Sequence, residues 1–92
     1  MPKLVWLESA ETDLDNIADY IAQDNVVAAI DVYLQVKESS KGLLDHPKIG
    51  RPGRVKGTRE RIVMGTKLII IYRLTDRIEI IRILHGSQRW GD

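Results

Sequence analysis

Four side chains in the second half of the chain have the chemistry of a catalytic site. His85 follows an apolar segment, and a histidine can pass a proton to or from a ribose hydroxyl or a leaving oxygen near neutral pH. Arg59, Arg73 and Arg82 stand in segments with the alternation of β-strands. An arginine there must bring its charge to water, a carboxylate or a phosphate. Structural alternatives stay open, because His85 could cap a sheet edge and the arginines could pair with carboxylates of this chain.

A second group of residues could bind a target or a nucleic acid. These residues are Arg51, Arg54, Lys56, Arg59, Arg61, Arg89 and Trp90. The first three lie in a loop rich in glycine and proline that leads into the strand of Arg59. The ring of Trp90 could stack on a base or seal an interface. The loop lacks a Lys-Ser/Thr ending, so it does not predict a site for a nucleoside triphosphate.

The charge of the chain is divided unequally between its two halves. Residues 1–45 carry three Lys and Arg against nine carboxylates, and residues 46–92 carry eleven against four, although the net charge is only +1. Such asymmetry predicts a basic surface with an anionic partner. The alternative is a basic rim that the acidic half of the same chain neutralises.

The composition excludes several classes of protein. The chain has no cysteine and only two histidines, which excludes a disulfide framework and argues against a zinc site, so we predict no metal and no cofactor. Its 92 residues predict a single domain, 1–92. No apolar run approaches the roughly 18 residues of a membrane span, and no signal peptide is visible. The expected location is the cytoplasm.

Two helices are expected in the first half, after a short apolar strand at residues 3–7. Apolar residues from Leu14 to Ile21 recur at i, i+3, i+4 and i+7, which predicts an amphipathic helix that Ser9 caps. Asn25 is expected to cap a second helix, which Pro47 ends. Because about two residues separate them, the two helices should form an αα-hairpin.

Three strands follow the helices in this interpretation. They are expected over residues 58–64, 68–74 and 78–84, joined by short turns. The fold class is therefore predicted to be α+β: a single βααβββ domain whose αα-hairpin packs on one face of a mainly antiparallel four-stranded sheet. Strand alternation places Arg73 on the face of Ile69, and Arg82 on the face of Ile80.

Several short motifs, taken in order, carry a resemblance to a known family. They are Ala10 with Asp13-Leu14, Ile17 through Tyr20-Ile21, Ala28-Ala29, Leu44 through His46-Pro47, Gly50-Arg51-Pro52-Gly53, Gly57-Thr58-Arg59-Glu60, Tyr72-Arg73 and the ending Ile80 to Trp90. Each motif alone is weak, but their order and spacing over nearly the whole chain are specific. On these residues the chain resembles the RelE/ParE superfamily of bacterial toxins from type II toxin–antitoxin modules, whose fold is the βααβββ arrangement.

The resemblance implies one of two activities. RelE-like members are mRNA endonucleases that cut on the ribosome without a metal, and for that activity Arg59, Arg73, Arg82 and His85 are the catalytic candidates. ParE-like members poison DNA gyrase, and the long second helix with the pattern GTRE…YR…LHGSQRW is closer to that branch, so gyrase is the expected target. A small antitoxin protein is the expected partner in both cases. A module that binds nucleic acid without toxicity is the alternative from another class.

Overall fold

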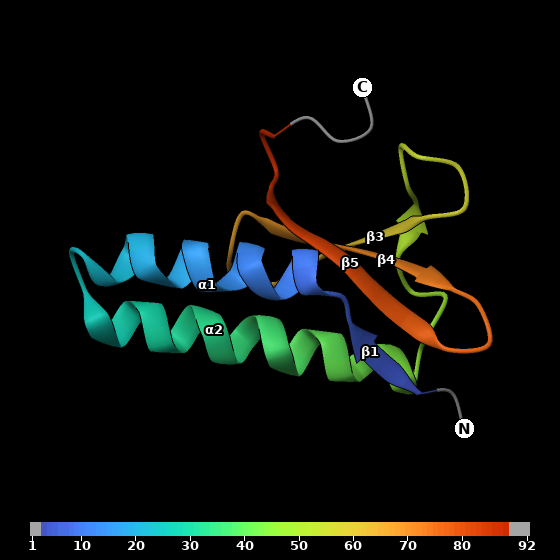
Figure 1. Cartoon of the computed structure of the whole chain (residues 1–92), viewed down its shortest axis with the longest axis horizontal. Helices are drawn as coiled ribbons and strands as arrows, with labels where there is room; N and C mark the ends of the chain where they lie inside the picture. Colours follow the sequence, from blue (N-terminus) through green and yellow to red (C-terminus); the bar gives the residue numbers. More distant parts are fainter. Residues whose placement is uncertain (1–2, 89–92) are drawn as a thin grey trace.

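A computed structural model describes residues 3–88 of the chain. Two helices pack on one face of a mixed sheet with the strand order β1-β5-β4-β3-β2 (Figure 1). The elements are β1 (Leu4–Trp6), α1 (Glu8–Ala22), α2 (Val26–Lys41), the 3-10 helix η1 (Gly42–Leu44), β2 (Arg51–Pro52), β3 (Arg59–Ile62), β4 (Leu68–Leu74) and β5 (Ile78–His85). β1 is parallel to β5, and the other neighbouring strands are antiparallel. The predicted α+β fold with an αα-hairpin is confirmed.

The sheet has five strands, one more than the sequence predicted. Arg51 and Pro52 form a two-residue strand that pairs with Glu60 and Arg59 of β3, in a stretch that we expected to be a loop. Two residues are too few to show the alternation by which a strand is recognised in a sequence. Pro52 is tolerated because β2 is an edge strand, where a missing N–H leaves no partner unsatisfied.

The two helices begin differently from one another. Asn25 caps α2 as predicted, since its side-chain Oδ1 accepts a hydrogen bond from the backbone N–H of Ala28 at 3.0 Å. The predicted cap of α1 is wrong, because Leu7 occupies the N-cap position and Ser9 lies inside the helix. Among residues 3–88 no helix is long and apolar enough to cross a membrane.

The apolar core lies between the helices and β4, β5 and the residue after β3. Its largest fully buried side chains include Leu14 of α1, Val36 of α2 and Tyr72 of β4. A smaller cluster of Ile69, Ile71 and Leu84 lies on the opposite side of the sheet. We call that side the open face, because neither helix covers it.

An extra residue in β5 changes which side chains reach each face. Ile71 of β4 pairs with Arg82 and Tyr72 pairs with Ile80, so Ile81 has no partner across the ladder. Such a bulge shifts the alternation by one residue, and the predicted placement of Arg82 on the face of Ile80 is therefore wrong. Ile83 joins Ile80 in the core under the helices, and Leu84 joins the cluster on the open face.

Beyond the end of β1, side chains of α1 make the hydrogen bonds to the outer edge of β5. The parallel pairing of β1 ends at Trp6, and the backbone N–H of Leu7 makes the last bond, to the carbonyl of Ile80 at 3.0 Å. Beyond that point the Ser9 hydroxyl donates to the carbonyl of Ile81 at 2.5 Å. The Asp13 carboxylate accepts the backbone N–H of Ile83 at 3.0 Å. The helix thus satisfies backbone groups that a longer strand would otherwise pair.

Asp13 also binds the side chain of Arg82. Its Oδ2 accepts from Nε at 2.7 Å and its Oδ1 accepts from Nη2 at 3.1 Å. The hydrogen bonds that the guanidinium donates to the Asp13 carboxylate raise the pKa of Arg82 above its usual value, so they favour the charged form. Asp13 therefore ties α1 to β5 by both a backbone and a side-chain contact.

Replacing Asp13 by Ala should destabilise the fold by about 1–3 kcal/mol, because it leaves the N–H of Ile83 and the half-buried guanidinium of Arg82 without this acceptor. Urea unfolding followed by circular dichroism measures the change. The matched control is Asp15→Ala, which removes an exposed carboxylate from the same helix and should cost less than about 0.5 kcal/mol. Equal losses for the two variants would contradict the role assigned to Asp13.

Candidate functional site

The open face carries two buried carboxylates, and two arginines hold each of them. The first is Glu60 of β3, whose side chain is only 2% exposed. It accepts from Arg51 Nη2 at 3.1 Å and from the backbone N–H of Arg54 at 3.0 Å. The guanidinium of Arg54 lies 3.8 Å from the same carboxylate. Such contacts are required, because a carboxylate removed from water is stable only when it is paired.

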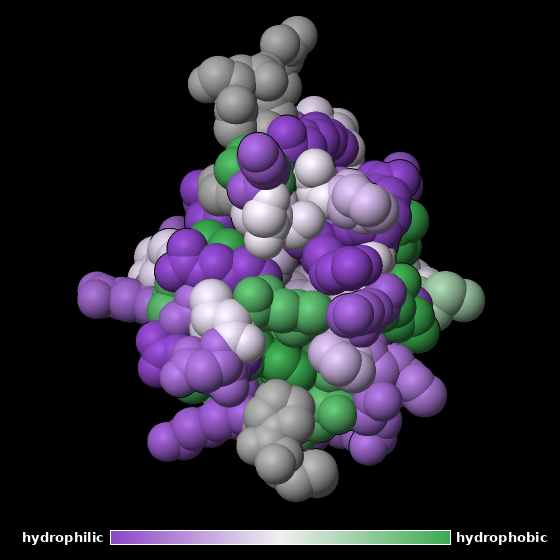
Figure 2. Space-filling view, turned by 90° about the vertical axis from the view of Figure 1, so that its right-hand side faces the viewer, coloured by the Kyte–Doolittle hydropathy of each residue, from purple (hydrophilic) through white to green (hydrophobic). Residues whose placement is uncertain are grey.

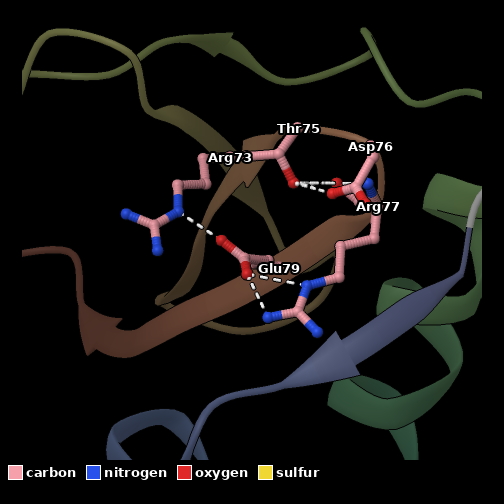
Figure 3. A network of polar contacts seen from close by, with 5 residues as sticks. All are labelled: Arg73, Thr75, Asp76, Arg77 and Glu79. Atoms are coloured by element: carbon pink, nitrogen blue, oxygen red, sulfur yellow. Dashed lines mark hydrogen bonds and ion pairs between the residues drawn. The ribbon is translucent and has the colours of Figure 1, made fainter.

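Glu79 of β5 is the second carboxylate, with a side chain 7% exposed. One of its oxygens accepts from Arg73 Nε, and the other accepts from Arg77 Nε at 2.8 Å. Figure 3 shows the two guanidinium groups on opposite sides of the carboxylate, next to the turn that joins β4 and β5. Hydrogen bonds from Arg73, and then from Arg77, hold the pKa of Glu79 below its usual 4.5, although burial acts in the opposite direction.

Arg59 belongs to a different network, which fixes the loop before β2. Its Nη1 donates to the carbonyl of Gly50 at 2.8 Å. The hydroxyl of buried Tyr72 accepts the N–H of Gly50 at 2.9 Å and donates to the carbonyl of Pro47 at 2.8 Å. A Cβ atom at Gly50 would lie 2.6 Å from that hydroxyl oxygen, so only glycine allows the loop to approach this closely.

The four catalytic candidates do not meet in one place. Arg73 lies on the open face, whereas Arg82 reaches Asp13 of α1 at the outer edge of β5. Arg59 binds the loop. His85 pairs with Leu68 at the far end of the β4–β5 hairpin, five residues along β4 from Arg73, which is about 17 Å in an extended strand. A shared catalytic role of the four stays a prediction.

His85 is exposed at the end of β5. Its Nδ1 lies 2.8 Å from the Ser87 hydroxyl and accepts the backbone N–H of Ser87 at 3.3 Å. The backbone N–H of His85 donates to the side-chain oxygen of Gln88 at 2.6 Å. These contacts form a tight turn after the strand, in which the imidazole acts as an acceptor. No group of three His, Cys, Asp or Glu side chains placed to hold a metal exists within residues 3–88.

Two of the predicted binding residues have cationic side chains that are not paired with any other group in the described part of the chain. Neither Arg61, which is half-buried, nor Lys56, which is exposed, makes a hydrogen bond or ion pair through its side chain with any part of residues 3–88. Hydrophilic side chains cover most of the end of the molecule that faces the viewer in Figure 2, with a smaller hydrophobic area between them. The predicted residues Arg89 and Trp90 lie outside the described part of the chain.

A groove between the helices and the end of the sheet was not predicted from the sequence. It has a volume of about 610 Å³. Its lining residues are Asn16, Ile17, Tyr20, Ile21, Val32, Thr66, Lys67, Leu68, His85 and Gln88. Tyr20 is 75% exposed although it lies one turn after Ile17, beside the apolar stripe of α1. That large aromatic side chain on the edge of the stripe was the signal in the sequence that could have indicated this groove.

Comparison with known proteins identifies the class to which this architecture belongs. Residues 4–90 match the sequence model of the family described as the ParE toxin of the type II toxin–antitoxin system parDE. This match extends over the sheet, both helices and the groove. The chain belongs to the ParE toxin family within the RelE/ParE superfamily.

Individual relatives agree with this assignment. The chain is 35% identical to the putative toxin Y4kP of Sinorhizobium fredii over 96% of its own length and 92% of the relative. It is 32% identical to toxin RelE2 of Caulobacter vibrioides, over 96% and 99% of the two chains. A solved structure of the chromosomal ParDE system from P. aeruginosa superimposes with a TM-score of 0.83 at 28% identity, covering 92% of this chain and 96% of that one.

The lowered pKa of Glu79 predicts how stability depends on pH. A carboxyl whose folded pKa lies below its unfolded pKa stabilises the fold above the unfolded value, here about 4.5, and loses that contribution as the pH falls through the folded value. Glu79→Gln should therefore be less stable than the wild type at pH 7 and should lose less stability on acidification below about pH 4.5. Urea midpoints across this range provide the measurement. The control is Asp76→Asn, which removes an exposed carboxyl from the same turn and should leave the dependence of stability on pH unchanged. Identical profiles for the wild type and Glu79→Gln would contradict the link between protonation of Glu79 and stability.

Proposed function

We propose that this toxin acts on DNA gyrase rather than by cutting mRNA on the ribosome, and that it acts in the cytoplasm. The observation that carries the proposal is the engagement of the arginines by the chain itself. Arg73 is bound by Glu79, Arg82 by Asp13, and Arg59 by loop carbonyls. A reaction without a metal requires a cation near the reacting phosphate and an acid–base group within hydrogen-bonding reach of it.

The remaining acid–base group stands apart from those cations. His85 occupies the opposite end of the β4–β5 hairpin from Arg73, and its Nδ1 is directed to Ser87. Breaking an arginine–carboxylate contact to recruit the cation would leave the buried carboxylate of Glu79 with only one of its two arginines, which is costly. The arrangement favours a protein that inhibits by binding over one that cleaves RNA.

Binding to gyrase would use the cations that the chain leaves unpaired within its described part. Arg61 and Lys56 lie on and just before β3. Ile62, the last residue of β3, is exposed, and so is Ile49 in the loop before β2. That loop, fixed around Gly50, leads into the edge strand β2, which pairs with β3 over only two residues. A preorganised edge with apolar and cationic groups suits a protein surface, because little ordering entropy is lost on binding.

The antitoxin partner fits the groove, which lies on another part of the molecule. The similar solved structure from P. aeruginosa is that of a toxin–antitoxin system, and we propose that this chain likewise pairs with an antitoxin, which inserts an amphipathic helix between α1 and the β3–β4 turn. Ile17, Ile21 and Leu68 would receive its apolar side chains. Lys67 at the rim would attract carboxylates of the antitoxin.

Expression of the chain alone in bacteria tests the gyrase proposal. We expect growth arrest with accumulation of covalent gyrase–DNA complexes, and growth restored by co-expression of the antitoxin. The same cells are examined for cuts in mRNA at ribosomal codon positions. Cuts in mRNA without gyrase–DNA complexes would overturn the proposal in favour of the nuclease, and unimpaired growth at confirmed expression would favour a non-toxic module that binds nucleic acid.

A substitution at His85 separates the two mechanisms at the level of one residue. His85→Gln keeps a hydrogen-bonding side chain but removes the titrating group, and general acid–base catalysis is worth about 10²–10⁴-fold in rate. We predict that His85→Gln remains toxic, because in the gyrase mechanism the imidazole only completes the turn with Ser87. Growth arrest after induction is the measurement. A folded variant that binds antitoxin but is harmless would establish the catalytic role instead.

Arg61→Ala is the positive control for loss of toxicity. This substitution removes an unpaired cation without breaking a side-chain hydrogen bond or ion pair within residues 3–88, so it should weaken target binding and leave the fold intact. Full toxicity of Arg61→Ala would remove this residue from the proposed gyrase-binding edge.

Charging the groove should weaken the antitoxin complex. Tyr20→Asp places a carboxylate on the apolar lining, and we expect the dissociation constant of the antitoxin complex to rise at least about tenfold. Surface plasmon resonance with purified antitoxin measures it. Thr12→Asp adds the same charge to the exposed side of α1 and should leave the affinity unchanged. Equal affinities for the two variants would exclude the groove as the antitoxin site.

A further inference from the structure

Helix α2 is apolar on two sides, and only one of them is used by the fold. Ala29 and Val36 are buried in the molecule. A separate set of large apolar side chains is exposed: Val26 at 61%, Val27 at 68%, Ile30 at 53%, Tyr33 at 36% and Leu34 at 58%. At about 100° per residue these five side chains fall within roughly 120° of the circumference of the helix. We call them the α2 stripe.

The α2 stripe is not part of the groove assigned to the antitoxin. The groove is lined by Val32 and by residues of α1 and the sheet end, and it contains no residue of the stripe. Figure 1 shows that the end of the hairpin where α1 passes into α2 extends well beyond the strands. No strand can therefore cover the first half of the stripe, and a patch of this size on one helix is typical of an interaction site.

The charges at the two ends of the stripe are opposite in sign. Lys41, with a side chain 66% exposed, lies in the last turn of α2, and its contact with Glu38 is a long surface pair of 4.0 Å. Asp24 lies just before the first turn, and it is exposed. When two such helices pack antiparallel about a point between Ile30 and Leu34, Lys41 of each copy comes within about one residue of Asp24 of the other, since the two residues lie about nine and eight positions from that point.

We propose that the α2 stripe is the interface through which two copies of this chain pair around a two-fold axis. The surface is self-complementary in the way that a two-fold interface requires: apolar residues face apolar residues at the centre, and a cation faces a carboxylate at both ends. Antiparallel packing also places the helix dipoles in their favourable relative direction.

The size of the stripe sets the expected strength of pairing. Two stripes would bury on the order of 1,000 Å² in total, which is at the lower end of the range for specific interfaces. The dimer should therefore form only at elevated concentration. We expect sedimentation velocity of the full chain, freed from its antitoxin, to change from monomer to dimer between about 1 and 100 µM.

Substitutions in the stripe test the interface. Ile30→Glu places a charge at its centre and should raise the dissociation constant of the dimer at least about tenfold. Leu34→Glu, one turn along the same stripe, should have the same effect, which guards against a local defect at one position. Thr12→Glu adds the same charge to the exposed side of α1 and should leave dimerisation unchanged. Circular dichroism of each variant checks that the helices are retained.

A charge reversal tests the register. Lys41→Glu should weaken the dimer, and adding Asp24→Lys in the same chain should restore it, because each copy then supplies both reversed partners. Double substitution without restoration would overturn the antiparallel arrangement.

Three results would overturn the proposal as a whole. A chain that stays monomeric at every concentration has no such interface, and a dimer that survives Ile30→Glu uses another surface. A monomer in which Ile30→Glu weakens antitoxin or gyrase binding assigns the stripe to that partner. Growth arrest and antitoxin binding are measured independently of sedimentation. A negative result for the dimer therefore does not bear on the proposal that the toxin acts on gyrase.

Discussion

The outer edge of β5 is the constraint on which the rest of the structure depends. β5 has eight residues, but its parallel neighbour β1 has three, so the second half of its edge lacks a strand partner. Backbone groups in this position need hydrogen bonds as much as those inside a sheet do. Ser9 and Asp13, which are one helical turn apart on α1, supply them to Ile81 and Ile83. These contacts fix the orientation and the position of α1 relative to the sheet.

This attachment has consequences at both ends of the hairpin. Because the first turns of α1 are fixed along β5, its last turns and the start of α2 project past the strands (Figure 1). The projection creates the groove with Tyr20 on one side and leaves the stripe with Ile30 on another. The two surfaces that we assign to partners thus both follow from the shortness of β1 and from the attachment of α1 to β5 beyond the end of β1.

Local features were predictable from the sequence, and long-range ones were not. The ranges of β4 and β5 and the Asn25 cap were found because alternation, turn residues and capping act over a few neighbouring positions. The pairing of Asp13 with Arg82 joins residues 69 positions apart, and nothing in the local pattern of either one specifies the other. The bulge at Ile81 depends on the strand opposite, so alternation alone placed Arg82 on the wrong face.

The charge pattern shows how a correct observation can carry an ambiguous meaning. The second half of the chain is strongly basic, and part of that charge serves the fold: Arg51 and Arg54 hold Glu60, and Arg73 and Arg77 hold Glu79. Each carboxylate is buried between two cations. These ion pairs persist because a buried carboxylate without a partner would destabilise the fold, and the attraction in an exposed ion pair is weak by comparison. A phosphate of a bound nucleic acid would have to compete for these arginines with a carboxylate that is fixed in the same fold. A sheet built in this way favours recognition through its edges and helices, where apolar groups and unpaired cations meet a partner without dismantling the fold.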